Sequence, residues 1–168
     1  MGSSMLGVDK KDDKKKDQQM STGAVVGIGV GTGALTSPPF GLDGYQFSGR
    51  IGGDVQINRI VLGILAQYGY DHVSLFGSTI NPKEVLVAAR AGVLITDTAL
   101  LYGLAGETWL SGVSGLSTHG LTTGGGLEVA MTRNWRVGLE YNHTTYDALS
   151  TAQEQSVTAR VIFAFPVR

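Results

Sequence analysis

The chain has 168 residues, a net charge of −1, 25 glycines and no cysteine, and charged residues make up only 16 % of it. One domain is therefore expected, a disulfide framework and a thiolate metal site are excluded, and the charge gives no field for binding nucleic acid. Charged residues fall below the roughly 25 % of soluble domains, yet no run approaches the ~18 apolar residues of a transmembrane helix, which leaves membrane and soluble β-structures as the main fold classes.

The first 21 residues differ from the rest in composition. Asp9–Gln19 reads DKKDDKKKDQQ and holds five of the six lysines. A segment of mixed charge without apolar residues cannot bury enough surface to offset the entropy of ordering. We therefore expect a disordered charged tail over residues 1–21, serving as a spacer, a contact with anionic lipid or a solvated leader, and a barrel domain over residues 22–168.

From residue 22 onward the pattern has a period of two, which indicates β-strands. Each predicted strand is close to the ~9–11 residues that cross a bilayer at a tilt. The eight predicted strands are Gly23–Ala34, Gly44–Ile57, Ile60–Asp71, Val85–Ile95, Thr98–Leu110, Gly120–Thr132, Trp135–His143 and Ser156–Phe165.

The predicted connections alternate in length. Asn58-Arg59, Thr96-Asp97 and Arg133-Asn134 read as two-residue turns, and longer polar loops lie near 35–43, 72–84, 111–119 and 144–155. Outer-membrane barrels have short periplasmic turns and longer extracellular loops. The pattern predicts an all-β fold, a closed antiparallel eight-stranded transmembrane β-barrel of a bacterial outer membrane, with both termini in the periplasm.

Alternate residues of the predicted strands fall into two sets. One set is large and apolar, and in the fifth strand we assign Leu100, Tyr102 and Leu104 to it. The other set is mostly glycine, including Gly103, with four arginines and four carboxylates among them. These eight residues form the predicted lumen charge network: Arg50, Asp54, Arg90, Glu107, Glu128, Arg136, Glu140 and Arg160.

The composition of the second set decides which face points inward. A water-facing strand surface would carry Lys, Thr, Ser and Glu, whereas glycine on an exposed strand face covers nothing. The interior of an eight-stranded barrel is just wide enough for side chains to fill, so small residues leave room for arginines and carboxylates to pair. We therefore assign the apolar set to lipid and the charged set to the lumen, against the alternative of a soluble barrel.

Aromatic residues of the apolar set lie near both ends of the strands. Two aromatic belts at opposite ends are typical of membrane–water interfaces, although a soluble β-protein also enriches aromatics in its core. The predicted interface girdle consists of Tyr45, Phe47, Tyr68, Tyr70 and Tyr141 at the loop side and Trp135, Phe163 and Phe165 at the turn side.

Three segments carry a family resemblance. They are IVLGILAQYGYD at 60–71, VLVAARAGVLITDTALLYGLAGETW at 85–109 and GGGLEVAMTRNWRVGLEYNHTTY at 124–146. With these segments the chain resembles, over about residues 23–165, the outer-membrane β-barrel domain family of proteobacterial surface proteins, which includes opacity-type and OmpA/OmpX-like porin-family proteins. The resemblance implies the barrel fold and carries no shared catalytic residues.

The sequence predicts a non-enzymatic surface protein without cofactor or metal site, serving membrane integrity, adhesion or loop-mediated docking of a partner. Outer-membrane lipid and lipopolysaccharide are its expected contacts, a protein partner at the loops is a further candidate, and nucleic acid is not expected. A lipid A-modifying enzyme centred on His72 or His143 and a narrow gated pore stay open as alternatives, as does the oligomeric state. His119 completes the three scattered histidines, whose spacing does not match a metal site.

Overall fold

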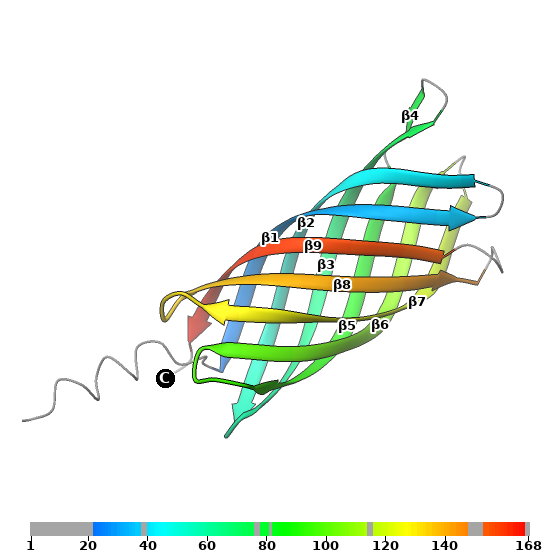
Figure 1. The fold of residues 1–168 in the computed structure, drawn as a ribbon. Coiled ribbons are helices and arrows are strands. Elements are labelled where there is room, and N and C mark those ends of the chain that lie inside the picture. The colour runs from blue at the N-terminus through cyan, green and yellow to red at the C-terminus, as the bar shows by residue number, and fades with distance from the viewer. Residues whose placement is uncertain are drawn as a thin grey trace, which may run out of the picture.

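The computed structural model describes residues 22–37, 40–75, 78–80, 82–113, 116–147 and 153–166, and the predicted tail at 1–21 lies outside them. The described residues form a single tilted β-sheet closed on itself (Figure 1). No helix in this part of the chain is long and apolar enough to cross a membrane. The strands are β1 Gly23–Ser37, β2 Phe40–Ile57, β3 Ile60–Leu75, β4 Ser78–Ile80, β5 Lys83–Leu94, β6 Ala99–Val113, β7 Leu116–Ala130, β8 Trp135–Tyr146 and β9 Gln153–Pro166.

The sheet is a closed, antiparallel, eight-stranded barrel, as predicted. Its strand order is β2-β1-β9-β8-β7-β6-β5-β3-β4, and a further pairing of β2 with β3 closes the ring. The short β4 continues β5 along the same edge of β3, because Tyr70 pairs with Lys83 and Val73 with Ile80 in one register. β4 therefore extends the hairpin beyond the rest of the barrel, where it projects in Figure 1.

The tight turns cluster at one end of the barrel, where β1 also begins and β9 ends (Figure 1). Asn58 has a φ of 56°, the left-handed conformation that a two-residue hairpin turn requires. The other two turns are longer than the predicted two residues, since their strands end at Leu94 and Ala130. In each, a threonine hydroxyl accepts a hydrogen bond from the backbone N–H that opens the next strand: Thr96 from Ala99 (3.0 Å) and Thr132 from Trp135 (3.1 Å).

At the opposite end the strands run further than the sequence predicted. Segments assigned to loops belong to β1, β3, β6 and β8, which end at Ser37, Leu75, Val113 and Tyr146. The predicted strands stopped where the outward side chains are no longer apolar, but backbone pairing between the strands continues beyond that point. Thr145, His119 and Gln153, for example, all lie in paired strands and are exposed on the outer face.

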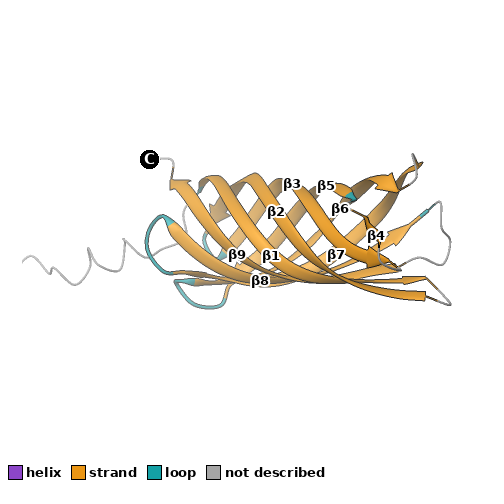
Figure 2. Ribbon diagram, turned by 90° about the horizontal axis from the view of Figure 1, so that it is seen from above, coloured by secondary structure: helices purple, strands orange, loops and turns teal. Residues whose placement is uncertain are grey.

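Burial alternates along the strands, as in β5, where every second residue except Gly92 is buried. Outward-facing residues are large and apolar over most of the barrel height, for example Ile28, Ile64 and Leu139, which are 70 %, 71 % and 60 % exposed. Figure 2 shows the tilted strands forming one barrel. One side of that lumen is filled by an apolar cluster of Val61, Leu65, Leu86, Ala88, Leu94, Leu100, Tyr102, Leu104 and Ala130.

In β6 the predicted assignment of faces was wrong. Leu100, Tyr102 and Leu104 are buried in the lumen, at 0 %, 5 % and 5 % exposure, whereas Gly103 and Glu107 lie on the outer face. This strand has large apolar residues in both phases, so the parity argument cannot orient it. The lumen takes the three larger side chains because they complete the apolar cluster contributed by β3 and β5.

Candidate functional site

Ion pairs in the turn-side half of the lumen join four strands. Arg90 on β5 donates two hydrogen bonds to Asp54 on β2, from Nε to Oδ1 at 2.9 Å and from Nη2 to Oδ2 at 2.5 Å. Its Nη1 also binds Glu128 Oε1 on β7 at 2.5 Å. Arg136 on β8 binds Asp54 Oδ2 at 3.0 Å. The two arginines and two carboxylates form what we call the turn-side cluster, in which all four side chains are at most 2 % exposed.

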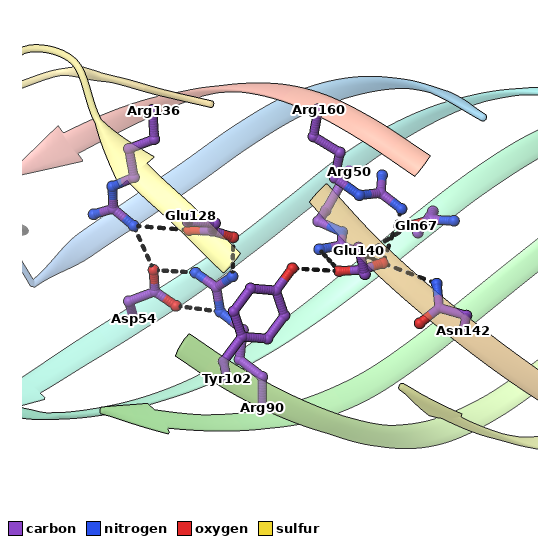
Figure 3. Close-up of polar contacts among 10 residues, drawn as sticks. All are labelled: Arg50, Asp54, Gln67, Arg90, Tyr102, Glu128, Arg136, Glu140, Asn142 and Arg160. Carbon is purple, nitrogen blue, oxygen red and sulfur yellow. Dashed lines mark hydrogen bonds and ion pairs between the residues drawn. The ribbon is translucent and has the colours of Figure 1, made fainter. Parts of the chain in front are cut away.

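A second group, the central cluster, lies further towards the loops (Figure 3). Glu140 on β8 accepts two hydrogen bonds from Arg50 on β2, at 2.5 Å and 2.7 Å, and one from Arg160 on β9 at 3.0 Å. Arg50 is also bound by Gln67 Oε1 at 3.0 Å, and Asn142 donates to Glu140 at 2.9 Å. One carboxylate thus serves two guanidinium groups, which makes Glu140 the centre of this cluster.

Tyr102, which the sequence analysis assigned to lipid, links the two clusters. Its hydroxyl donates to Glu140 Oε2 at 2.7 Å, and its ring lies 5.1 Å from the guanidinium carbon of Arg90. A buried tyrosine needs a partner for its hydroxyl, and its ring face attracts a cation. Sequence reasoning missed this residue because an isolated aromatic in an alternating strand carries no signal for the inner face.

Glu107 does not belong to the network that the sequence predicted. The structure brings together the other seven charged residues in the lumen, but it places Glu107 on the outer face of β6, exposed. Val87 and Leu121, its cross-strand neighbours, are both exposed apolar residues. The seven lumen residues therefore comprise four arginines and three carboxylates, a net charge of +1 instead of zero.

Glycines provide the space for these long side chains. A Cβ added at Gly63 would meet the Asp54 carboxylate and the Arg90 side chain, and one at Gly29 would lie 3.0 Å from Arg160 Nη1. Glycines on the inner face thus leave the space that the arginine and carboxylate side chains occupy.

In the loop-side half of the lumen most contacts are between uncharged polar side chains, and the carboxylates of Glu84 and Glu154 accept hydrogen bonds from Gln46 and Tyr146. Thr108, Thr122 and Thr144 form a ladder of buried hydroxyls, with Oγ1–Oγ1 distances of 2.5 Å and 2.7 Å. At its upper limit Tyr146 donates to Glu154 Oε2 at 2.7 Å. Burial raises the pKa of Glu154, and the hydrogen bond from Tyr146 partly offsets that increase.

The eight predicted girdle residues all lie on the outer face. Seven are between 41 % and 68 % exposed, and Phe163 is half-buried because Trp135 and Phe165 pack edge-on against it with ring centroids 5.0 Å and 4.8 Å away. Trp109, 41 % exposed on β6, joins the loop-side aromatics. Its place on the outer face was not predicted, because the faces of that strand were assigned the wrong way round.

Around His119 and His143 the described residues form no arrangement of hydroxyl, imidazole and carboxylate. His119 Nε2 lies 3.4 Å from Asp147 Oδ2 on the exposed outer surface. The Thr118 hydroxyl donates a hydrogen bond to the backbone oxygen of His119 at 3.5 Å, and not to its imidazole ring. An acyl transferase or lipase needs a hydroxyl, a base and a carboxylate within mutual reach. No group of three or more His, Cys, Asp or Glu in the described part of the chain could hold a metal ion.

The comparison with protein families agrees with this architecture. The family described as outer membrane protein beta-barrel domain matches residues 4–163. The chain belongs to this family. Its exposed apolar outer face is accordingly the surface that meets lipid, and its expected location is the outer membrane of Gram-negative bacteria. No curated protein matches the sequence.

Solved structures with the same fold are distant in sequence. Ail of Yersinia pestis, crystallised with the heparin analogue sucrose octasulfate, is 18 % identical with a TM-score of 0.61, covering 87 % of this chain and 100 % of Ail. Neisserial surface protein A is 19 % identical with a TM-score of 0.61, covering 88 % and 100 %. The outer membrane enzyme PagL is 14 % identical with a TM-score of 0.54, covering 83 % and 99 %. At such identities the comparison shows a shared fold only. The structures with this fold include the enzyme PagL as well as Ail and Neisserial surface protein A.

Proposed function

We propose that this protein is a non-enzymatic surface barrel of the outer membrane, with its turns and termini in the periplasm and its loop end docking an external protein partner. The observation that carries the proposal is the projection of the loop end beyond the apolar surface. The outward residues there form what we call the polar rim: Ser111, Ser117, His119, Thr145, Gln153 and Gln155, all exposed.

The rim stands above the loop-side aromatics. On β6, for example, Trp109 is followed two residues later by Ser111, and on β8 Tyr141 is followed by Thr145 on the same face. Because aromatic belts sit at the membrane–water interface, strands that continue beyond them enter water. The β3–β4 hairpin reaches furthest in this direction (Figure 1). A rigid scaffold that carries paired strands and loops into the medium is suited to protein contact.

The filled lumen argues against transport as the main activity. The turn-side and central clusters cross the lumen from β2 to β5, β7, β8 and β9, and their side chains are nearly inaccessible to solvent. Opening a water path would separate buried ion pairs, which costs several kcal/mol for each pair. We therefore favour a closed structural barrel over a pore.

A sulfated polysaccharide is a weaker candidate than a protein as the loop-end ligand. Ail was crystallised with a heparin analogue. The described loop-end residues include one lysine, Lys83, which is exposed, as is the carboxylate of Asp147, whereas Glu84 and Glu154 lie on the inner face. A polyanion needs a surplus of cations, and this balance does not supply one.

The experiment compares bacteria with and without the protein for lipid A composition and for adhesion to immobilised proteins. We expect an unchanged lipid A mass spectrum and adhesion that is lost when residues 72–80 are replaced by a two-residue Asn-Gly turn. The control changes the opposite end, Asn58-Arg59 to Asn-Gly, and should retain adhesion. An altered acyl pattern that disappears with His72→Ala or His143→Ala would refute the proposal in favour of a lipid-modifying enzyme.

A further inference from the structure

An apolar furrow crosses the outer face of six strands. Its two walls are rows of directly paired outward residues. One row leads from Tyr68 on β3 through Gly49 on β2 to Val129 on β7, and the other from Tyr70 through Ala159 on β9 to Leu127. The cavity between the rows has a volume of about 910 Å³. With a strand spacing of ~4.8 Å, five steps between six strands give a length of roughly 24 Å.

The two rows include small residues as well as large ones. A Cβ added at Gly49 would have no heavy atom within 4 Å, and Ala159 contributes only a methyl group. Larger side chains such as Phe47 and Leu139 flank this point on the same faces, at 58 % and 60 % exposure. The hollow is therefore lined almost entirely by apolar atoms, and Gly29, Ser48, Gly138 and Arg160 lie between its two rows.

The furrow climbs the barrel. Val129 and Leu127 lie next to the turn at 131–134, whereas Tyr68 and Tyr70 belong to the loop-side girdle. Its length exceeds half of a hydrocarbon core ~30 Å thick, so the furrow accommodates a lipid chain that starts at the loop-side interface.

A polar group marks the upper end. The Tyr68 hydroxyl donates to the Tyr70 hydroxyl at 3.1 Å, which leaves the Tyr70 proton to donate to another acceptor, and the structure records no such acceptor among the described residues. Lys83 pairs with Tyr70 across β3 and β5, and its side chain is exposed. In the described part of the chain Lys83 makes no ion pair. A hydroxyl donor and an unpaired ammonium beside an apolar furrow fit an anionic head group with an attached hydrocarbon chain.

The opposite outer face lacks this combination. On β6 the small outward residues Gly103 and Ala105 are followed by Glu107, whose carboxylate would repel an anionic head group. The furrow and its cation thus occur together on one side only, and Ala105 offers a matched control position.

We propose that the furrow binds one molecule of lipopolysaccharide through its lipid A, with an acyl chain between the two rows and a phosphate on Lys83 and Tyr70. The choice of lipopolysaccharide over a phospholipid rests on the orientation proposed above, which places the loop end in the outer leaflet. At this site the lipid would be specifically bound, whereas other lipids around the barrel exchange with the bulk membrane.

The test uses the purified full-length barrel in detergent, mixed separately with lipid A, phosphatidylglycerol or phosphatidylethanolamine, with retained lipid measured by native mass spectrometry. We expect one lipid A retained by the wild type and about tenfold weaker retention in Lys83→Gln and Tyr70→Phe, the effect of one charge-assisted hydrogen bond. Ala159→Trp should abolish retention, whereas Ala105→Trp should leave it unchanged. Heat-modifiable migration on gels confirms that each variant is folded.

Three results would overturn the proposal. They are equal retention of lipid A and phosphatidylethanolamine, equal loss in Ala159→Trp and Ala105→Trp, or a second protein copy instead of lipid in the mass spectrum. Stronger retention of phosphatidylglycerol than of lipid A would also overturn it, because the furrow would then bind a phospholipid and not lipopolysaccharide. Because no adhesion is measured, failure here is distinguishable from failure of the proposed protein docking.

Discussion

Replacing Glu140 by glutamine is the sharpest test of the lumen network. The substitution keeps the shape of the side chain but removes the charge that serves both Arg50 and Arg160. It also replaces one acceptor oxygen with an NH2 donor that faces their guanidinium groups. The net charge of the seven lumen residues would rise from +1 to +2.

The expected magnitude follows from the contacts that remain. Breaking a buried ion pair by removing one partner costs about 3–5 kcal/mol. After the change Arg50 keeps the Gln67 oxygen at 3.0 Å and Arg160 keeps the Ser48 hydroxyl at 3.1 Å, so the lower end of that range is expected. Arg50→Met should cost less, because Glu140 retains its pair with Arg160. The double variant should cost less than the sum of the two single variants.

The assay is equilibrium unfolding in urea with lipid vesicles, followed by tryptophan fluorescence. Trp109 and Trp135 both lie on the outer face, so their emission reports transfer from lipid to water. Glu107→Gln, on the outer face, is the control and should not destabilise. A Glu140→Gln variant as stable as wild type, or costs that simply add in the double variant, would refute a connected lumen network.

Three further substitutions test the packing, the lipid face and the loop end. Gly106→Ala should destabilise or prevent folding, because its Cβ would overlap the backbone of β5, whereas Gly49→Ala should be tolerated in the same thermal-stability assay. Leu139→Lys should lower the free energy of unfolding in vesicles by about 2–4 kcal/mol if that position is near the bilayer midplane, and equal stability would contradict the lipid-facing assignment. The raised pKa of Glu154 means that the folded state disfavours its charged form, so this group lowers stability as pH rises above its ordinary pKa. Glu154→Gln should therefore gain stability relative to wild type at neutral pH and lose that advantage in acid, as urea unfolding across pH would show.

The faces of most strands could be predicted because glycine and charge occupy one phase and large apolar residues the other. β6 is the exception, since its two phases both contain leucines and the only charge, Glu107, is on the lipid side. The periodicity of one strand does not tell which of its two faces packs into the apolar cluster of the lumen. That choice depends on the side chains of β3 and β5, which meet Leu100 and Leu104 only in the folded barrel.

The partners within the lumen could not be predicted either. Glu140 pairs with Arg50, 90 positions away, and Arg90 pairs with Asp54, 36 positions away. These distances in sequence follow from the stagger between neighbouring strands, which fixes the height of each residue in the barrel. A shift of two residues in one register would keep every side chain on its face and exchange the pairs.

The pairing of β1 with β9, from Gly23 opposite Pro166 to Thr36 opposite Gln153, makes closure of the barrel depend on both ends of the described chain. The first strand lacks one neighbour until the last strand has been synthesised and delivered. In hydrocarbon, each unpaired backbone group on an open edge costs several kcal/mol, so a sheet of fewer strands has no stable place in the bilayer. The closed barrel is therefore the stable inserted form, and we expect a chain truncated within the final strand not to insert stably.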